Sequence, residues 1–175
     1  MGALVLEVEA KVRLVEPEGL RRRLRELGAR SGAACEQVDV FFSHPARDLA
    51  STDEALRLRA SAGRLELTYK GPRQPGAVKS REELTVVVDS DPTALLQALG
   101  FVPLFRLRKR REAWRLGEAE VALDRLEGLG AFAEVEAPTT RHVEAALAAL
   151  GLASLPREAK SYLELALAAG AVERL

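Results

Sequence analysis

The chain has 175 residues, of which 47% are hydrophobic and 30% are charged, and its 26 basic and 26 acidic residues cancel to a net charge of zero. This length fits one domain, residues 1–175, with a sizeable core, and the composition argues against disorder. The zero net charge argues against broad electrostatic binding to nucleic acid or to an anionic membrane. The single cysteine, Cys35, excludes an internal disulfide and a Cys-rich zinc site. No apolar run is long enough to span a bilayer, and the first residues do not resemble a signal peptide, so we expect a cytoplasmic protein.

Alternation of apolar and polar residues predicts eight strands. In the first of them, Leu6 and Val8 share one face, while Glu7 and Glu9 share the other. The predicted strands cover residues 3–14, 36–43, 55–60, 64–70, 81–89, 104–116, 119–126 and 131–137. The short link 61–63 ends in a glycine and predicts a hairpin. Turn-forming residues are frequent in two further segments, and they predict a loop over 43–53 and a mobile loop over 71–80.

Four helices are predicted between and after these strands from their capping residues and apolar spacing. The predicted helices run from Pro17 to about Gly28, from Asp91-Pro92 to Gly100, from Thr139 or Thr140 to Leu150, and from Pro156 through Leu165. Because the helices interrupt the strands at irregular places, the pattern predicts an α+β fold with a largely antiparallel sheet. Eight strands are enough to close such a sheet into a barrel.

The polar faces of several predicted strands consist of charged residues rather than of Ser, Thr or Gln. A strand has a two-residue period, which places charges at alternate positions on the same side. These neighbouring charges are Glu7, Glu9 and Lys11; Arg57 and Arg59; Arg64, Glu66 and Lys70; and Glu134 and Glu136. For any one strand, the simplest interpretation is an amphipathic sheet with its charges in water. If the sheet closes with these faces inward, the charges instead line a tunnel, together with Asp124 and residues of the basic strand 104–116.

A tunnel with charges of both signs predicts a ligand that carries both phosphate oxygens and divalent cations. Removing many charges from water costs several kcal/mol per ion, so stability alone is a poor reason to keep them. Carboxylates hold Mg²⁺ or Mn²⁺, which prefer oxygen ligands. Arginine and lysine hold phosphate oxygens. A polyphosphate with a divalent metal therefore fits the pattern best.

The basic strand leaves two questions open. The run RLRKRREAWR, 106–115, is basic on both faces, so its periodicity does not decide between Arg108/Arg110 and Lys109/Arg111 as the inward pair. Taken alone, the run would also suit a nucleic-acid patch, which the zero net charge and the few aromatic residues disfavour.

Several short motifs, in this order along the chain, resemble those of the CYTH superfamily, the triphosphate tunnel enzymes. Glu7-Val-Glu9-Ala-Lys11 resembles its ExExK signature, which by itself would be a weak signal. The further matching blocks are Arg57-Leu-Arg59, Tyr69-Lys70-Gly71-Pro72, Arg81-Glu82-Glu83, Lys109-Arg110-Arg111, Leu123-Asp124, the segment 129–136 and Ser161-Tyr162-Leu163. Within the superfamily, residues 39–48, 52–57 and 99–103 are most similar to class IV adenylyl cyclases.

This resemblance implies an eight-stranded antiparallel closed tunnel with flanking helices, a single CYTH-like domain that binds a nucleoside triphosphate with Mg²⁺ or Mn²⁺. It implies an adenylyl cyclase, in which the ribose 3′-oxygen attacks the α-phosphorus and expels pyrophosphate. The implied metal ligands are Glu7, Glu9, Glu134 and Glu136, with Asp124 nearby. The implied substrate-binding residues are Lys11, Arg57, Arg59, Lys70, Lys109 and Arg111. The implied catalytic residues are Glu9, Lys11, Asp124 and Glu136.

Other functions stay open at this point. A triphosphatase would use the same charged residues, with water attacking the γ-phosphorus of inorganic triphosphate, thiamine triphosphate or a nucleotide. A non-catalytic phosphate-binding module would have no use for the acidic residues. We expect His44 to be a turn residue rather than a catalytic one, and the pattern leaves open whether Arg81 and Glu83 face the tunnel. The helices could cover the apolar outer face of strand 3–14, and the Leu- and Ala-rich helices at 139–169 could equally pack across a twofold axis. The resemblance implies a homodimer, and no nucleic-acid or membrane partner is expected.

Overall fold

The computed structural model describes residues 4–76 and 78–175, so Ala3 of the first predicted strand and Ala77 of the predicted loop 71–80 lie outside the described residues. The strands are β1 (Leu4–Leu14), β2 (Arg30–Ser31), β3 (Cys35–Ser43), β4 (Ala55–Ser61), β5 (Arg64–Gln74), β6 (Lys79–Val88), β7 (Val102–Leu116), β8 (Ala119–Leu126), β9 (Gly130–Glu136) and β10 (Glu173–Arg174). The helices are α1 (Pro17–Glu26), α2 (Thr93–Ala98), α3 (Thr140–Ala149) and α4 (Tyr162–Ala169).

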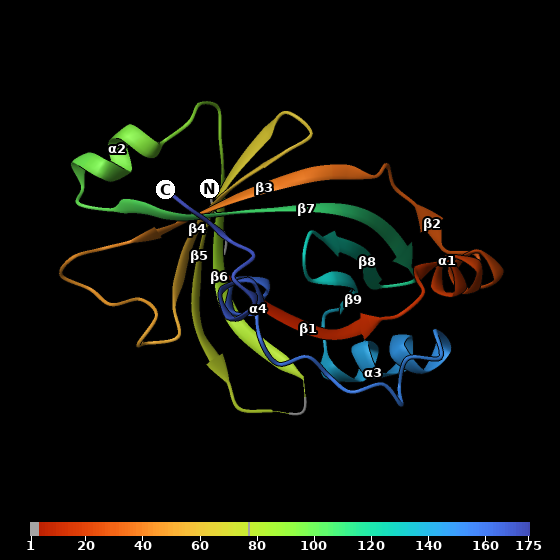
Figure 1. The fold of residues 1–175 in the computed structure, drawn as a ribbon. Helices are drawn as coiled ribbons and strands as arrows, with labels where there is room; N and C mark the ends of the chain where they lie inside the picture. Colours follow the sequence, from red (N-terminus) through yellow and green to blue (C-terminus); the bar gives the residue numbers. More distant parts are fainter. Residues whose placement is uncertain (1–3, 77) are drawn as a thin grey trace.

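Eight of these strands form a closed antiparallel barrel (Figure 1). The strands follow one another in the order β7-β3-β4-β5-β6-β1-β9-β8, and β8 pairs with β7 to close the ring. The two-residue strands β2 and β10 add short pairings to β7. The predicted α+β fold with a closed eight-stranded barrel is therefore confirmed.

The predicted hairpin between β4 and β5 is tight because of its turn residues. Ser61 and Arg64 are paired across the turn, so only Ala62 and Gly63 connect the strands. Both residues have a positive φ, 48° and 78°, as a two-residue hairpin turn of this hand requires. The turn sets the register that places Arg57 opposite Thr68 and Arg59 opposite Glu66.

The prediction of a mobile loop over 71–80 was wrong for most of the segment. Strand β5 continues to Gln74, and β6 already begins at Lys79. The pairing register shifts between Lys70 and Arg73, which leaves Pro72 in a bulge where the missing N–H breaks no ladder bond. The proline and glycine residues thus mark a bulge and a turn rather than a long loop.

The last helix begins later than predicted, at Tyr162 instead of Pro156. Ser161 caps it, because its hydroxyl accepts a bond from the Glu164 amide while the Glu164 carboxylate accepts one from the Ser161 amide. The preceding residues lie against β1, where the Glu158 amide donates to the Lys11 carbonyl at 2.8 Å. This contact with the barrel keeps residues 157–158 out of the helix.

Apolar packing covers the barrel outside and closes part of it inside. Helices α1 and α3 cover the outer face of β1, β8 and β9, where Leu24, Val121 and Leu147 are fully buried. Helix α4 packs on an inner group that contains Phe132 and Tyr162. In the part of the chain that the structure describes, no helix is long and apolar enough to cross a membrane. The fold thus leaves the charged inner faces of the strands around a space beside α4.

Candidate functional site

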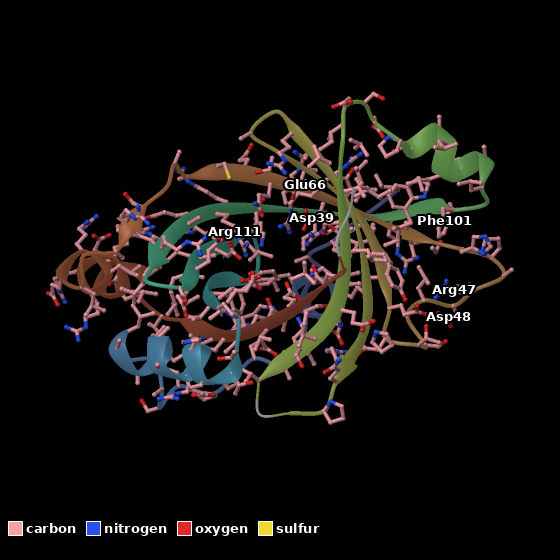
Figure 2. All side chains as sticks on the ribbon, turned by 180° about the vertical axis from the view of Figure 1, so that it is seen from behind. Asp39, Arg47, Asp48, Glu66, Phe101 and Arg111 are labelled. Atoms are coloured by element: carbon pink, nitrogen blue, oxygen red, sulfur yellow. The ribbon has the colours of Figure 1, made fainter. Side chains whose placement is uncertain are left out.

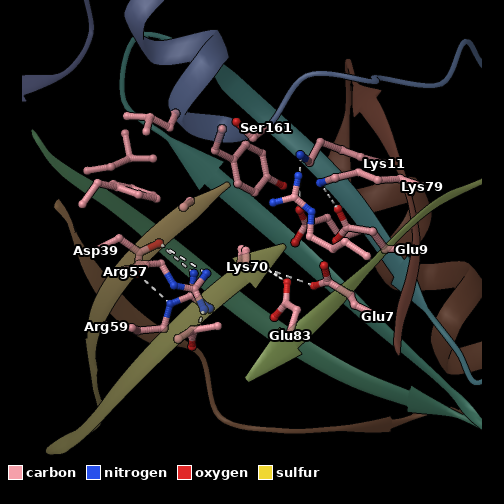
Figure 3. Close-up of a pocket in the computed structure, with 18 of the residues that line it drawn as sticks. Glu7, Glu9, Lys11, Asp39, Arg57, Arg59, Lys70, Lys79, Glu83 and Ser161 are labelled. Carbon is pink, nitrogen blue, oxygen red and sulfur yellow. Dashed lines mark hydrogen bonds and ion pairs between the residues drawn. The ribbon is translucent and has the colours of Figure 1, made fainter. Parts of the chain in front are cut away.

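A cavity of about 490 Å³ lies inside the barrel, and every strand of the ring contributes charged side chains to its wall. The acidic residues on the barrel strands are Glu7, Glu9, Asp39, Glu66, Glu83, Glu120, Glu134 and Glu136. The basic residues are Lys11, Arg57, Arg59, Lys70, Arg73, Lys79, Arg81, Lys109 and Arg111. Figure 3 shows Asp39, Arg57 and Arg59 on one side of this cavity, Glu9, Lys11 and Lys79 on the other, and Lys70 between them with Glu7 and Glu83.

Ten of the eleven residues that the sequence singles out line this one cavity. The barrel also decides the question that periodicity leaves open in β7. Lys109 is buried and Arg111 lines the cavity, whereas Arg108 and Arg110 are exposed on the outside. Figure 2 shows Asp39 and Arg111 between the walls of the barrel. Their roles in binding and catalysis remain predictions.

Asp124 is the one predicted residue that does not line the cavity, although it is the cross-strand partner of Arg111, which does. The side chain is fully buried. One carboxylate oxygen accepts a bond from Lys109 Nζ at 2.9 Å, and the other accepts one from Arg111 Nε at 2.8 Å. Because both oxygens are committed to these two bases, Asp124 supplies the counter-charge that keeps Lys109 and Arg111 in the wall.

Asp39 plays a similar part for Arg59, and the sequence analysis did not identify it. Arg59 donates two parallel bonds to the Asp39 carboxylate, at 2.6 and 2.7 Å, and Arg57 Nη1 lies 4.0 Å away. Burial alone would raise the pKa of Asp39, but the bonds from Arg59 and the charge of Arg57 lower it to about 2. The sequence signal that could have identified Asp39 is a single acidic residue within the otherwise apolar strand segment VDVFF, 38–42.

Two arginines in the wall have free donor atoms. The Nε atoms of Arg57 and Arg81 are buried, and neither has a hydrogen-bond partner within the described residues. Arg57 makes only a long bond of 3.4 Å to the Thr68 hydroxyl. Unpaired buried donors cost free energy, and an anion that accepts from them would recover it.

Lys79, Arg81 and Glu83 form an inward row on β6. Lys79 pairs with Glu9, and Glu83 pairs with Lys70. The structure thus answers the open question about Arg81 and Glu83, because both line the cavity. Lys79 was not among the predicted site residues, because it falls in the predicted loop 71–80. The alternation of charges at 79, 81 and 83 was the signal that could have identified it.

Carboxylates gather on the side of the cavity formed by β1, β8 and β9. Burial raises the pKa of Glu136 to about 7, and the negative charges of Glu7, Glu120 and Glu9 add to this effect. Glu7 Oε2 is buried and has no hydrogen-bond partner among the described side chains. Glu134 pairs with two bases, Arg111 and Lys11, whereas Glu9 pairs with Lys79 and Glu7 pairs with Lys70.

The carboxylates on this side of the cavity offer the oxygen ligands that Mg²⁺ or Mn²⁺ prefers, and such an ion would offset their excess negative charge. As the side chains stand, no three acidic, His or Cys residues of the described ranges are close enough together to hold a metal ion. The residues therefore fit a divalent cation by charge and by donor type, and their side chains would have to converge on it.

His44 lies away from the cavity, as expected of a turn residue. Its backbone forms a bridge with Arg47, and its ring packs edge-on against Phe101 with 5.0 Å between the ring centres. Figure 2 shows Phe101 and Arg47 at the end of the molecule where the loop between β3 and β4 projects.

Comparison with known proteins agrees with this geometry. The model of the CYTH domain family matches residues 6–161, which is most of the chain. The chain belongs to the CYTH family. The matched range begins just before Glu7 and ends at the cap of α4, so it contains all charged residues of the cavity wall on the barrel strands.

Two curated CYTH relatives carry adenylate cyclase names. MJ0240 of Methanocaldococcus jannaschii, which its name assigns provisionally to the adenylate cyclases, is 35% identical over 134 residues, 75% of this chain and 77% of the relative. Adenylate cyclase CyaB of Aeromonas hydrophila is 29% identical over 169 residues, 89% of this chain and 86% of the relative.

Solved structures share the whole barrel. PH1819 of Pyrococcus horikoshii is 32% identical with a TM-score of 0.80, and the match covers 93% of this chain and 98% of that one. HpAC1 of Hippeastrum, described with a dominant triphosphatase activity, is 24% identical with a TM-score of 0.71, and the match covers 93% and 95% of the two chains. The latter likeness shows the fold alone.

The arrangement around Asp124 predicts a large loss of stability when its charge is removed. Asp124→Ala leaves the buried bases Lys109 and Arg111 without this partner, and breaking a buried ion pair from one side typically costs about 3 to 5 kcal/mol. Urea unfolding followed by circular dichroism measures the change. The control is Glu118→Ala on the surface, which should stay within about 0.5 kcal/mol of wild type. A loss for Asp124→Ala as small as that of the control would contradict this role.

Proposed function

We propose that this CYTH protein acts on a triphosphate held in the charged cavity, and that its reaction converts ATP to cyclic AMP and pyrophosphate. The observation that carries the proposal is the cavity itself, where basic and acidic side chains from all eight barrel strands meet in a single space. A binder of anions alone would need only the bases, and a binder of cations alone only the acids. A metal–triphosphate complex uses both.

In this proposal the basic residues hold the phosphates. Arg57 has one buried donor, Nε, without a partner among the described residues, and Lys70, Lys109 and Lys11 line the same cavity. Arg59 and Arg111 are fixed by carboxylates and add positive charge without having to move. Such prearranged charges would stabilise the negative charge that develops on the leaving pyrophosphate.

The metal would be held by Glu7, Glu9 and Glu136. Glu9 would have to loosen its pair with Lys79, and Glu7 its pair with Lys70. Glu134, which the sequence also suggested as a ligand, would join them by releasing Arg111 or Lys11. When bound, Mg²⁺ or Mn²⁺ would supply Lewis-acid stabilisation of the phosphoryl oxygens.

The proposed reaction is an internal displacement. The ribose 3′-oxygen forms a bond to the α-phosphorus, and the bond from this phosphorus to the bridging oxygen of the β-phosphate breaks. The hydroxyl proton passes to a carboxylate or to water, and pyrophosphate leaves with the electron pair of the broken bond. Support for this reaction over hydrolysis comes from the names of the two curated relatives. ATP as substrate also agrees with the expected cytoplasmic location.

The second candidate is hydrolysis of a triphosphate in the same cavity. The described activity of HpAC1, a protein with the same fold, favours it. Water would then attack the γ-phosphorus, and the same bases would hold the phosphates. The two reactions differ in which phosphorus meets the nucleophile.

Identification of the products tests the proposal. The protein is incubated with Mg²⁺ or Mn²⁺ and, separately, with ATP, inorganic triphosphate and thiamine triphosphate. Cyclic AMP with pyrophosphate supports the cyclase, and orthophosphate supports the triphosphatase. No product from any of the three substrates would contradict the assignment of this cavity.

Glu9→Gln should abolish turnover, because the substitution removes a charge from the proposed metal ligands and from the ion pair with Lys79 while keeping the side-chain shape. We expect a loss of at least about a hundredfold in kcat, together with weaker Mn²⁺ binding by calorimetry and an unchanged circular dichroism spectrum. Glu127→Gln, on an exposed turn, serves as the matched control. Activity near that of the control would remove Glu9 from the site.

Triphosphate binding should depend on pH through Lys109. Burial and the charge of Arg111 together lower the pKa of Lys109 to about 8, although the charges of Glu134 and Asp124 act in the opposite direction. Below pH 8 the amine is charged and attracts the anion, so affinity should fall as the pH rises through about 8 to 10. A bound anion raises this pKa, and calorimetry of inorganic triphosphate should therefore detect proton uptake near pH 9.

Lys109→Arg provides the comparison, because arginine keeps its charge throughout this range. Calorimetry in buffers of different ionisation enthalpy should give a smaller proton uptake for the variant than for wild type. The same uptake in both proteins would mean that Lys109 does not titrate on binding.

We also propose a homodimer formed by the outer apolar face of β1 and β6. Leu6, Leu84 and Val86 share this face and are 49%, 40% and 40% exposed. Leu84→Glu should convert a dimer to a monomer in light scattering at micromolar concentration, whereas Val15→Glu, beyond the end of β1, should not. A wild-type protein that is monomeric under these conditions would contradict the dimer.

A further inference from the structure

The wall of the charged cavity includes an apolar rim made of Phe41, Ala50, Ala55, Leu163 and Leu167. These residues come from β3, the loop between β3 and β4, the start of β4, and α4. Leu163 and Leu167 are one helical turn apart and therefore share a face of α4. Leu167 is 41% exposed, so the rim is open to a ligand.

The rim adjoins two of the bases that we assign to phosphate binding. Phe41 is the cross-strand partner of Arg57, and Ala55 is that of Lys70. Side chains of directly opposed residues lie about 5 Å apart. Phe41 also packs against the inner apolar group that contains Tyr162 and Ala166, so the strand part of the rim lies beside helix α4.

Inorganic triphosphate would gain nothing from such a rim, because all its surface atoms are charged oxygens. An organic group joined to the triphosphate would lie against it while the phosphates reach Arg57 and Lys70. The cavity volume of about 490 Å³ falls within the range of sites for organic ligands.

We propose that the apolar rim binds the nucleoside of a nucleoside triphosphate and thereby selects nucleotides over inorganic triphosphate. This inference rests on the proposed function, because it requires the phosphates to lie among the bases of the cavity. It assigns Leu163 and Leu167 to substrate specificity and gives α4 a part in the site beyond packing. The rim would contribute to nucleotide binding whether the bound nucleotide is cyclised or hydrolysed.

The test compares two ligands on the same variants by calorimetry. The ligands are α,β-methylene-ATP, which cannot lose pyrophosphate, and inorganic triphosphate, each measured with Mg²⁺ and again with EDTA. The variants are Leu167→Ser, Leu163→Ala and the double variant, all of which leave the charge of the cavity unchanged. Leu95→Ser, at an exposed apolar residue of α2, is the control, and Arg57→Ala removes a phosphate contact.

We expect the double variant to bind the nucleotide about tenfold more weakly and inorganic triphosphate within twofold of wild type. Arg57→Ala should weaken both ligands, and Leu95→Ser neither. Leu167→Ser alone keeps the test valid if the double variant fails to fold, because this side chain is partly exposed.

Equal losses for the two ligands, or no loss for the nucleotide, would overturn the nucleoside site while leaving triphosphate binding intact. A wild-type protein that binds neither ligand would overturn the proposed function, and the nucleoside site with it.

Discussion

Charges of both signs inside one barrel have to be balanced, and this constraint governs the structure of the protein. Each strand of the ring points at least one charged side chain inward. Buried charges are tolerated only when they are paired and hydrogen-bonded. The pairs Arg59–Asp39, Lys109–Asp124 and Lys70–Glu83 connect different strands and satisfy this condition. The outer apolar layers under α1, α3 and α2, together with the inner apolar group around Phe132 and Tyr162, stabilise the barrel.

Some charges of the cavity wall are not fully paired, and these are the charges that the proposed ligand would contact. Arg57 and Arg81 keep buried Nε donors without partners in the described structure, and the carboxylates around Glu136 repel one another. Asp39 and Asp124, by contrast, are buried and hold their bases by direct hydrogen bonds. The site therefore contains two kinds of charge. The paired charges would act as a prearranged electrostatic environment, and the incompletely paired ones would find partners in a metal–triphosphate complex. The proposed function follows from this difference.

The sequence predicted the barrel and ten of the eleven singled-out residues as one set because strand periodicity links each charge to its neighbours two positions away. Periodicity did not choose Lys109 and Arg111 over Arg108 and Arg110, and the resemblance to the CYTH family supplied that choice. Asp124 could not be placed from the sequence, because whether an inward residue reaches the cavity or is buried against Lys109 and Arg111 depends on packing between strands. Lys79 was missed because proline and glycine are common to loops and bulges, and only the pairing of β5 with β6 distinguishes them. The start of α4 depended on the contact of Glu158 with Lys11, which lies 147 positions earlier in the chain.

The most direct measurement is a crystal structure of the protein with Mn²⁺ and α,β-methylene-ATP, in which anomalous scattering identifies the metal. The account predicts Mn²⁺ against Glu7, Glu9 and Glu136, with the triphosphate among Arg57, Lys70, Lys109 and Arg111. A nucleotide bound on the outer surface, with the barrel interior holding only its own ion pairs, would contradict it.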